Sequence, residues 1–133
     1  STIIGGQGVD ILSGDNGADI FSFSTGHTGI TALTADRILD FATGVDQIKI
    51  NGTKGDVVEA DGANMLFSGF TSAATAAFNG GIDVYAAYNV SGTGDTYVAI
   101  DHNASGTFNS GDSLIVLNNL NLDNQLVAGD FIA

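Results

Sequence analysis

Residues 5–13, GGQGVDILS, and residues 14–22, GDNGADIFS, are two consecutive nonapeptides. In both, glycine occupies positions 1 and 4, aspartate occupies position 6, and a large apolar residue occupies position 8. A fixed period of this kind predicts a solenoid, because each unit is too small to bury its apolar residue except against its neighbours. We therefore expect short strands separated by glycine-rich turns.

The nine-residue pattern continues in weaker form on both sides. Residues 23–31, 34–39 and 41–49 keep part of it, and Ser1, Thr2 and Ile3 fall where aspartate, a variable residue and the apolar residue belong. The pattern predicts that one apolar residue per unit points inward, namely Ile3, Leu12, Phe21, Ile30, Ile38 and Ile48.

The polar half of each unit favours calcium. Glycine tolerates positive φ, so main-chain carbonyls can converge beside the aspartate carboxylate. Such hard oxygen ligands suit Ca²⁺ and suit zinc poorly. A flexible loop or simple turns are the alternative, but two matching registers argue against it. The predicted calcium ligands of the two nonapeptides are Gly5, Gly6, Gly8, Asp10, Gly14, Asp15, Gly17 and Asp19.

The segment DRILDFATGVDQI at residues 36–48 resembles the stretch that closes the last coils of repeats-in-toxin (RTX) proteases, lipases and alginate epimerases. The nonapeptide itself is a signature of calcium-binding parallel β-helices. The resemblance implies that residues 1–50 are the end of a calcium-binding parallel β-roll. It also implies that Asp36, Asp40 and Asp46 help to fill the final calcium site or cap the roll.

The nine-residue period disappears after Ile50, so we expect residues 51–133 to form a β-rich cap. Residues 70–78 are alanine-rich and are followed by Asn79, Gly80 and Gly81, which predicts a short helix. Strand-like runs follow at residues 82–90, 95–100 and 112–120. The expected fold class is therefore mainly β, a parallel β-roll or β-helix followed by a small cap with one short helix.

The loop at residues 101–112 matches the spacing of an EF-hand calcium loop, with glycine at position 6. Asp replaces the usual Glu at position 12, and strands rather than helices flank the loop. A polar hairpin loop with Asx-type turns would use the same residues, so both interpretations stay open. The candidate ligands are Asp101, Asn103, Ser105, Thr107, Asn109 and Asp112.

The stretch from Gly94 to Ala133 resembles the C-terminal cap of many α-proteobacterial RTX proteins. That resemblance implies an extracellular or cell-surface bacterial protein and a partnership with the type I secretion machinery. In the family, the final residues are an uncleaved secretion signal, and Asp130-Phe-Ile-Ala fits such a signal. A last edge strand is the alternative, and both can hold.

The composition excludes several classes of function. The formal net charge is -12 with only 3 basic residues, so nucleic acid is a poor partner. No stretch approaches the roughly 18 apolar residues of a membrane span. Cysteine is absent, which excludes thiolate metal sites. Neither a Gly-x-Ser-x-Gly nor a His-Glu-x-x-His motif occurs, and His27 and His102 have no partner that specifies a role. We therefore expect no catalysis.

Three functions remain. The favoured one is a calcium-binding RTX module that supports the calcium-dependent folding, stability and type I secretion of a larger extracellular protein. Calcium-dependent self-assembly, as in a surface-layer protein or adhesin, is the second. A non-catalytic tail of a serralysin-like protease or lipase is the third.

Overall fold

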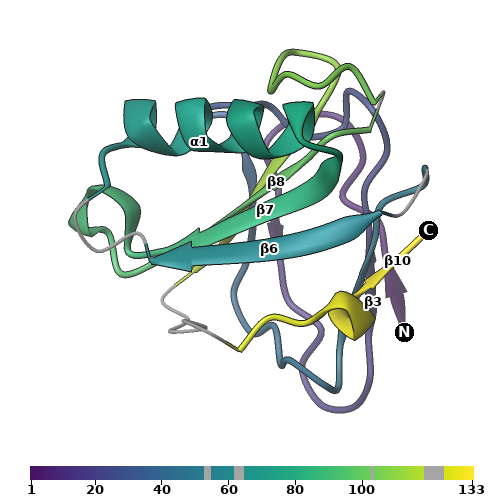
Figure 1. Cartoon of the computed structure of the whole chain (residues 1–133). Helices are drawn as coiled ribbons and strands as arrows, with labels where there is room; N and C mark the ends of the chain where they lie inside the picture. The colour runs from purple at the N-terminus through teal and green to yellow at the C-terminus, as the bar shows by residue number, and fades with distance from the viewer. Residues whose placement is uncertain (53–54, 62–64, 103, 119–124) are drawn as a thin grey trace.

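The computed structural model describes residues 1–52, 55–61, 65–102, 104–118 and 125–133. The described chain is mainly β, with strands in two sheets and one α-helix lying across one of them (Figure 1). This confirms the predicted fold class at the level of a β-rich domain. No helix in these ranges has the length and apolar character that crossing a membrane requires.

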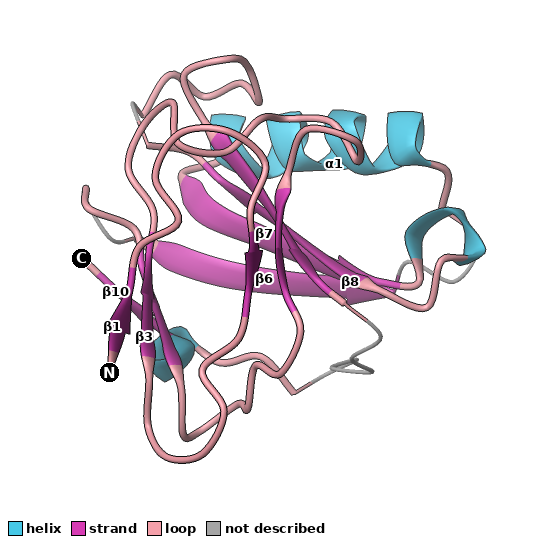
Figure 2. Cartoon of the chain, turned by 180° about the vertical axis from the view of Figure 1, so that it is seen from behind, coloured by secondary structure: helices cyan, strands magenta, loops and turns pink. Residues whose placement is uncertain are grey.

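The first sheet is entirely parallel. Its strands lie in the order β1 (Thr2–Ile3), β3 (Ile20–Ser22), β5 (Gln47–Lys49) and β10 (Phe131–Ile132). Figure 2 shows β1, β3 and β10 side by side, close to both ends of the chain. The final residues are therefore a strand of this sheet, as one of the two interpretations of the tail predicted.

The second sheet is mixed. The strand β9 pairs in parallel with β4, which pairs in parallel with β2, whereas β8 is antiparallel to both β9 and β7, and β6 is parallel to β7. Parallel pairing, as expected for a roll, therefore extends over only part of this sheet. In sheet order the strands are β2 (Ile11–Leu12), β4 (Asp36–Ile38), β9 (Ser113–Leu117), β8 (Thr96–Ile100), β7 (Ile82–Tyr88) and β6 (Asp56–Asp61).

Up to β5, successive strands alternate between the two sheets. Thr2 pairs with Ile20, a step of two nonapeptides. Ile20 in turn pairs with Gln47, a step of three, because residues 23–35 add a long turn without a strand. Both sheets also contain strands from residues 51–133, so residues 1–50 and the expected cap share their hydrogen-bonded sheets.

The core between the sheets contains most of the predicted inward positions. Leu12, Phe21, Ile38 and Ile48 are buried there, and the partly buried Ile3 packs against them.

The prediction for Ile30 was wrong. It lies in a bend outside both sheets and is half-buried. The physical reason is local, because Thr28 and Gly29 replace the aspartate and the first strand residue of the repeat. The Thr28 hydroxyl instead donates to the Leu114 carbonyl (2.8 Å) and accepts from the Asp36 N–H (2.7 Å).

The helix α1 (Phe67–Asn79) covers the outer face of β7, β8 and β9 (Figure 1). Phe70, Ala74 and Phe78 recur every four residues and bury one face of the helix. The helix extends the predicted segment by a few residues at its start. The three predicted strands of the cap correspond to shorter strands, and residues 119–120 of the last prediction lie outside the described residues. The strand β6 was not predicted. The described residues also form two short 3-10 helices, η1 (Val90–Gly92) and η2 (Ala128–Asp130).

Ile48 and Ile30 occupy the same position of the repeat but differ in burial, which gives a direct test. The Ile48→Ala substitution is expected to lower the free energy of unfolding by about 2 to 5 kcal/mol. Ile30→Ala is expected to cost about 1 kcal/mol or less, because its side chain is outside the core. Urea denaturation in calcium-containing buffer measures both, and equal losses would contradict the strand assignment.

Candidate metal centre

A repeated hydrogen bond links the aspartates of stacked turns. The backbone N–H of Asp10 donates to Oδ1 of Asp36 (2.8 Å), and that of Asp19 donates to Oδ1 of Asp46 (3.0 Å). The amino group of Ser1 donates to Oδ1 of Asp19 in the same way (2.8 Å). We call Asp10, Asp36, Asp19 and Asp46 the aspartate ladder. The pairing of β2 with β4 and of β3 with β5 brings each donor to its acceptor.

Three carboxylate oxygens of the ladder are buried without a hydrogen-bond partner, namely Oδ2 of Asp10, Asp19 and Asp36. Asp19 is 3% exposed and Asp36 is 0% exposed. Burial raises the pKa of Asp36 to about 6, and the nearby Asp10 carboxylate adds to the rise, although the Asp10 N–H opposes it. A buried charge without a partner is costly, so these oxygens fit a hard cation such as Ca²⁺ by both position and chemistry.

The predicted glycines have steric reasons for their positions. A Cβ on Gly5 would lie 2.6 Å from Oδ2 of Asp10, and a Cβ on Gly14 would collide with Oδ2 of Asp19 in the same way. The ladder carboxylates therefore fold back over a backbone that has no side chain. Positive φ, which glycine adopts without strain, explains the remaining predicted glycines, Gly6, Gly8 and Gly17.

The turn before β4 departs from the repeat. The Gly29 N–H donates to the Thr34 carbonyl (3.0 Å), and a Cβ on Gly29 would collide with the Thr34 side chain. Thr34 therefore occupies the place that Asp10 and Asp19 hold in their turns. A neutral hydroxyl replaces a carboxylate there, so this turn contributes less negative charge than the two nonapeptides do.

Asp40 caps the second nonapeptide turn. Its Oδ2 accepts from Ser13 Oγ (2.6 Å) and the Asp15 N–H (2.7 Å), and its Oδ1 accepts from the Gly14 N–H (3.0 Å). Burial alone would raise the pKa of Asp40, but these hydrogen bonds outweigh it and lower the pKa below its usual value. The Asp15 side chain, also a predicted ligand, is exposed and accepts from Ser13 Oγ (3.1 Å).

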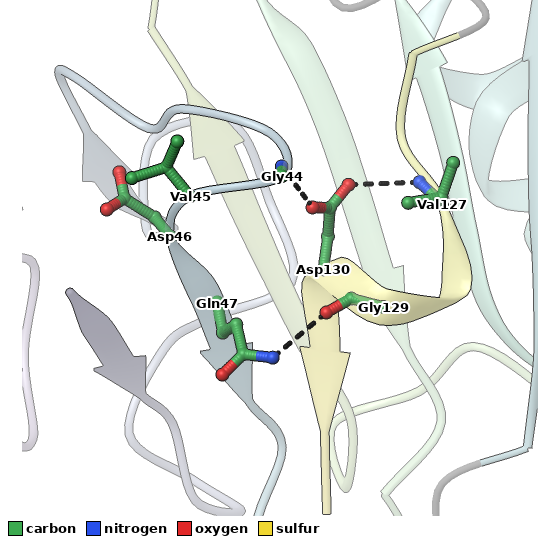
Figure 3. Close-up of a pocket in the computed structure, with 7 residues that line it drawn as sticks. All are labelled: Gly44, Val45, Asp46, Gln47, Val127, Gly129 and Asp130. Carbon is green, nitrogen blue, oxygen red and sulfur yellow. Dashed lines mark hydrogen bonds between the residues drawn. The ribbon is translucent and has the colours of Figure 1, made fainter. Parts of the chain in front are cut away.

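Asp46 ends the ladder. Both of its carboxylate oxygens accept hydrogen bonds, Oδ1 from the Asp19 N–H and Oδ2 from the Ala42 N–H (2.8 Å). The Asp130 carboxylate does not continue the ladder but is buried against the turn at residues 43–44 (Figure 3). Sequence reasoning treated Asp130 only as part of a tail signal. The available signal was an aspartate directly before a strand, as at Asp19 and Asp46.

The loop at residues 101–112 brings its first and last predicted ligands together. Asp101 and Asp112 are buried, and burial together with a hydrogen bond to Asp101 raises the pKa of Asp112 to about 6. The Asp101 carboxylate accepts from the Ser105 N–H (3.3 Å) and the Gly106 N–H (3.2 Å). Asp112 accepts from the Asn109 N–H (2.9 Å).

The other predicted ligands of this loop bind one another. The Asn109 side-chain amide donates to Ser105 Oγ (3.1 Å) and to Thr107 Oγ1 (2.9 Å). Asn103 lies outside the described residues. The described polar groups of the loop thus bind one another, the loop backbone and helix α1, whereas the aspartate ladder retains oxygens without a hydrogen-bond partner.

Within the described ranges, no three His, Cys, Asp or Glu side chains gather closely enough to hold a metal ion by side chains alone. Any ion at the ladder would therefore need main-chain carbonyls as well.

His102 pairs its Nε2 with Ser113 Oγ (2.7 Å), and burial lowers the pKa of His102.

Comparison with protein families decides the relationship of the chain. A family model described as "Peptidase M10 serralysin C terminal" matches residues 1–107. The chain belongs to the serralysin C-terminal family. This family is the C-terminal region of RTX proteins that leave bacteria by type I secretion, and it is a non-catalytic part of those extracellular proteins. The resemblance to RTX proteins and the extracellular location are thereby confirmed. Curated proteins give no match to the chain.

The glycines under the ladder carboxylates give a second test. In this serralysin C-terminal domain, Gly14→Ala is expected to cost about 1 to 3 kcal/mol, because the new methyl group displaces the Asp19 carboxylate. Gly129→Ala is the matched control, since a Cβ there meets no atom within 4 Å, and it should change the free energy of unfolding by less than about 0.5 kcal/mol. Urea denaturation measures both variants, and an unaffected Gly14→Ala variant would argue against the folded-back carboxylate.

The raised pKa values predict how the calcium-free serralysin domain responds to pH. Folded Asp36 and Asp112 have pKa values of about 6 against a usual 3.8, so the folded state binds protons more tightly than the unfolded state. Stability is therefore highest below pH 4 for these two groups and falls as the pH rises through about 6. Asp36→Asn should reduce this fall and stabilise the calcium-free domain at pH 7. Urea denaturation at several pH values is the measurement, and an Asp36→Asn variant with an unchanged pH dependence would contradict it.

Proposed function

We propose that this chain is a calcium-dependent folding module that enables the export and extracellular stability of a larger RTX protein. The observation that carries the proposal is the set of buried ladder oxygens without partners, Oδ2 of Asp10, Asp19 and Asp36. The nonapeptide pattern predicts Asp10 and Asp19 as calcium ligands, and the resemblance to RTX proteins implies the same for Asp36.

The proposal interprets the alternating strands of residues 1–50 as the last coils of a parallel β-roll. The candidate ligands in the turns are the carboxylates of Asp10, Asp19, Asp36 and Asp46, together with carbonyls of the glycine-rich turns. Calcium, when bound, supplies positive charge beside these carboxylates, whose neighbours in the ladder are themselves aspartates. Asp40 and Asp15 then serve the turn mainly by shaping its backbone.

Charge explains why folding would depend on the ion. The chain has a formal net charge of -12, and self-repulsion of this size opposes a compact state. In a cytoplasm with little free calcium, the repeats would stay open and suit passage through a narrow channel. Outside the cell, millimolar calcium would favour the folded state by mass action, because only the folded turns hold these carboxylates against the glycine-rich backbone.

A calcium titration tests the proposal. The free energy of unfolding should rise with Ca²⁺ concentration, by about 2.7 kcal/mol at a hundred times the dissociation constant. Mg²⁺ should do far less, because it demands a small octahedral site. A chelated module that is fully folded and gains no stability from Ca²⁺ would overturn the proposal.

Two matched variants locate the response. Asp19→Asn should remove most of the calcium-dependent gain, whereas Asp112→Asn should leave it intact if the ladder is the site. Loss of the gain only in Asp112→Asn would place the ion at the loop of residues 101–112 instead.

Self-assembly is a second candidate function, supported by exposed apolar side chains beside β1 and β2. Ile4, Val9 and Ile11 are 62%, 59% and 67% exposed, and among the described residues each of these two strands pairs on one side only. A second copy could extend both sheets there. Light scattering during the same titration separates the functions, because a purely intramolecular module stays monomeric. The third candidate, a tail of a serralysin-like protease or lipase, agrees with the family and is tested by the sequence of the parent gene upstream.

A further inference from the structure

Three asparagines of the chain are followed directly by glycine, namely Asn16, Asn51 and Asn79. Such a pair is open to deamidation, because glycine has no side chain to shield its backbone nitrogen. That nitrogen attacks the amide carbon of the asparagine side chain, a C–N bond forms, and the amide leaves as ammonia with the glycine N–H proton. Water then opens the cyclic imide at one of its two C–N bonds, which gives aspartate or isoaspartate.

The first sheet protects the side chain of Asn51. Its amide nitrogen donates to Ser22 Oγ (2.7 Å) and to the Phe23 carbonyl (3.0 Å). Both hydrogen bonds hold the amide, and both must break before its carbon can turn toward the nitrogen of Gly52. Ser22 is 8% exposed, so water replaces these bonds poorly.

The helix α1 protects the backbone at the second pair. Asn79 is the last residue of the helix, and the Gly80 N–H donates to the carbonyls of Ala76 (3.2 Å) and Ala77 (3.1 Å). A nitrogen that donates into the last turn of a helix is turned away from the side chain of the residue before it. The reaction at Asn79 therefore requires the end of the helix to open.

The second nonapeptide turn gives Asn16 neither kind of protection. Asn16 and Gly17 are both exposed. Among the contacts of the described residues, no hydrogen bond involves the Asn16 amide or the Gly17 N–H. The attacking nitrogen and the amide carbon are thus free to meet without the loss of any contact of the fold.

We propose that the pair of Asn16 and Gly17 is a site of selective spontaneous deamidation in the folded module, and that its isoaspartate product loosens the second nonapeptide turn. The selectivity comes from the fold, because all three pairs have the same two residues. The co-reactant is water, and the products are ammonia and a carboxylate in an exposed position of the turn.

The turn that carries Asn16 is anchored on both sides, which gives the modification its effect. The Asp15 N–H donates to Oδ2 of Asp40 (2.7 Å), and the Asp19 N–H donates to Oδ1 of Asp46 (3.0 Å). Isoaspartate carries the main chain through its side-chain carbon and so lengthens the chain by one atom between the two anchors. The turn must then bulge or release an anchor. The aspartate product keeps the length of the chain and adds only a charge.

The consequence for calcium rests on the proposed function. The carbonyls of this turn and the Asp19 carboxylate are among the candidate ligands, and a longer main chain displaces them from one another. The isoaspartate form therefore loses part of the calcium-dependent gain in stability.

Ageing the module in Ca²⁺ at mildly alkaline pH, followed by peptide mapping with mass spectrometry, tests the selectivity. Asn16 should convert at least about tenfold faster than Asn51 or Asn79, because the net strength of one hydrogen bond corresponds to roughly a factor of ten. In urea the three pairs should react at similar rates, since the fold no longer distinguishes them. Equal rates in the folded module would overturn the proposal.

A matched variant tests the cause of the selectivity. Ser22→Ala removes one of the two hydrogen bonds of the Asn51 amide, so it should accelerate deamidation of Asn51 and leave the rates at Asn16 and Asn79 unchanged. An Asn51 rate that stays the same in this folded variant would overturn the protective role of the hydrogen bond.

The purified isoaspartate form and the Asn16→Asp variant separate chain length from charge. In urea denaturation with Ca²⁺ present, the isoaspartate form should have a lower free energy of unfolding, whereas Asn16→Asp should stay close to the unmodified module. An isoaspartate form as stable as Asn16→Asp would overturn the inferred effect on the turn. A lower stability of the isoaspartate form, together with an unmodified module that gains nothing from Ca²⁺, would support this inference and overturn the proposed function alone.

Discussion

The structure depends on the hydrogen bond from the backbone N–H of one repeat aspartate to the carboxylate of the aspartate stacked beside it. In this bond, Oδ1 of Asp36 or Asp46 satisfies the backbone of the neighbouring turn. The same bond orients one carboxylate oxygen toward the backbone, and Oδ2 of the buried Asp36 accepts no hydrogen bond. Backbone order and uncompensated charge thus arise from one contact. The proposed cation would relieve the cost of that contact without breaking it, so calcium binding would also add to the stability of this fold.

The nonapeptides predicted the features that repeat. The period predicted the buried positions of Leu12, Phe21, Ile38 and Ile48, because each lies beside the equivalent residue of the neighbouring strand. The prediction for Ile30 was wrong because the nine-residue period was counted through residues 23–31, which lack the aspartate. At that position the Thr28 hydroxyl makes hydrogen bonds with two backbone groups instead. The mixed pairing of β6 to β9 lay beyond a local pattern, since parallel β6 and β7 come together across the helix α1.

The sequence predicted the residue types of the candidate site. It did not predict which carboxylate oxygens accept hydrogen bonds and which have no partner. The resemblance to RTX proteins grouped Asp40 and Asp46 with Asp36 as residues of the final calcium site or cap. Both oxygens of Asp40 and of Asp46 accept hydrogen bonds, whereas Oδ2 of Asp36 accepts none. The loop at residues 101–112 shows the converse case. Its spacing fits a chelating loop, but the short side chains of Ser105, Thr107 and Asn109 satisfy one another, an outcome that depends on rotamers and not on spacing.

The continuity of the second sheet has a consequence for the order of assembly. β7, β8 and β9 pair between neighbours in sequence, and such local contacts close small loops and form quickly. β9 then offers an unpaired edge to β4, and β4 offers one to β2. We therefore expect the cap to act as a template on which the repeats fold from the last toward the first. Growth in that direction would give the module a folding direction opposite to that of its synthesis.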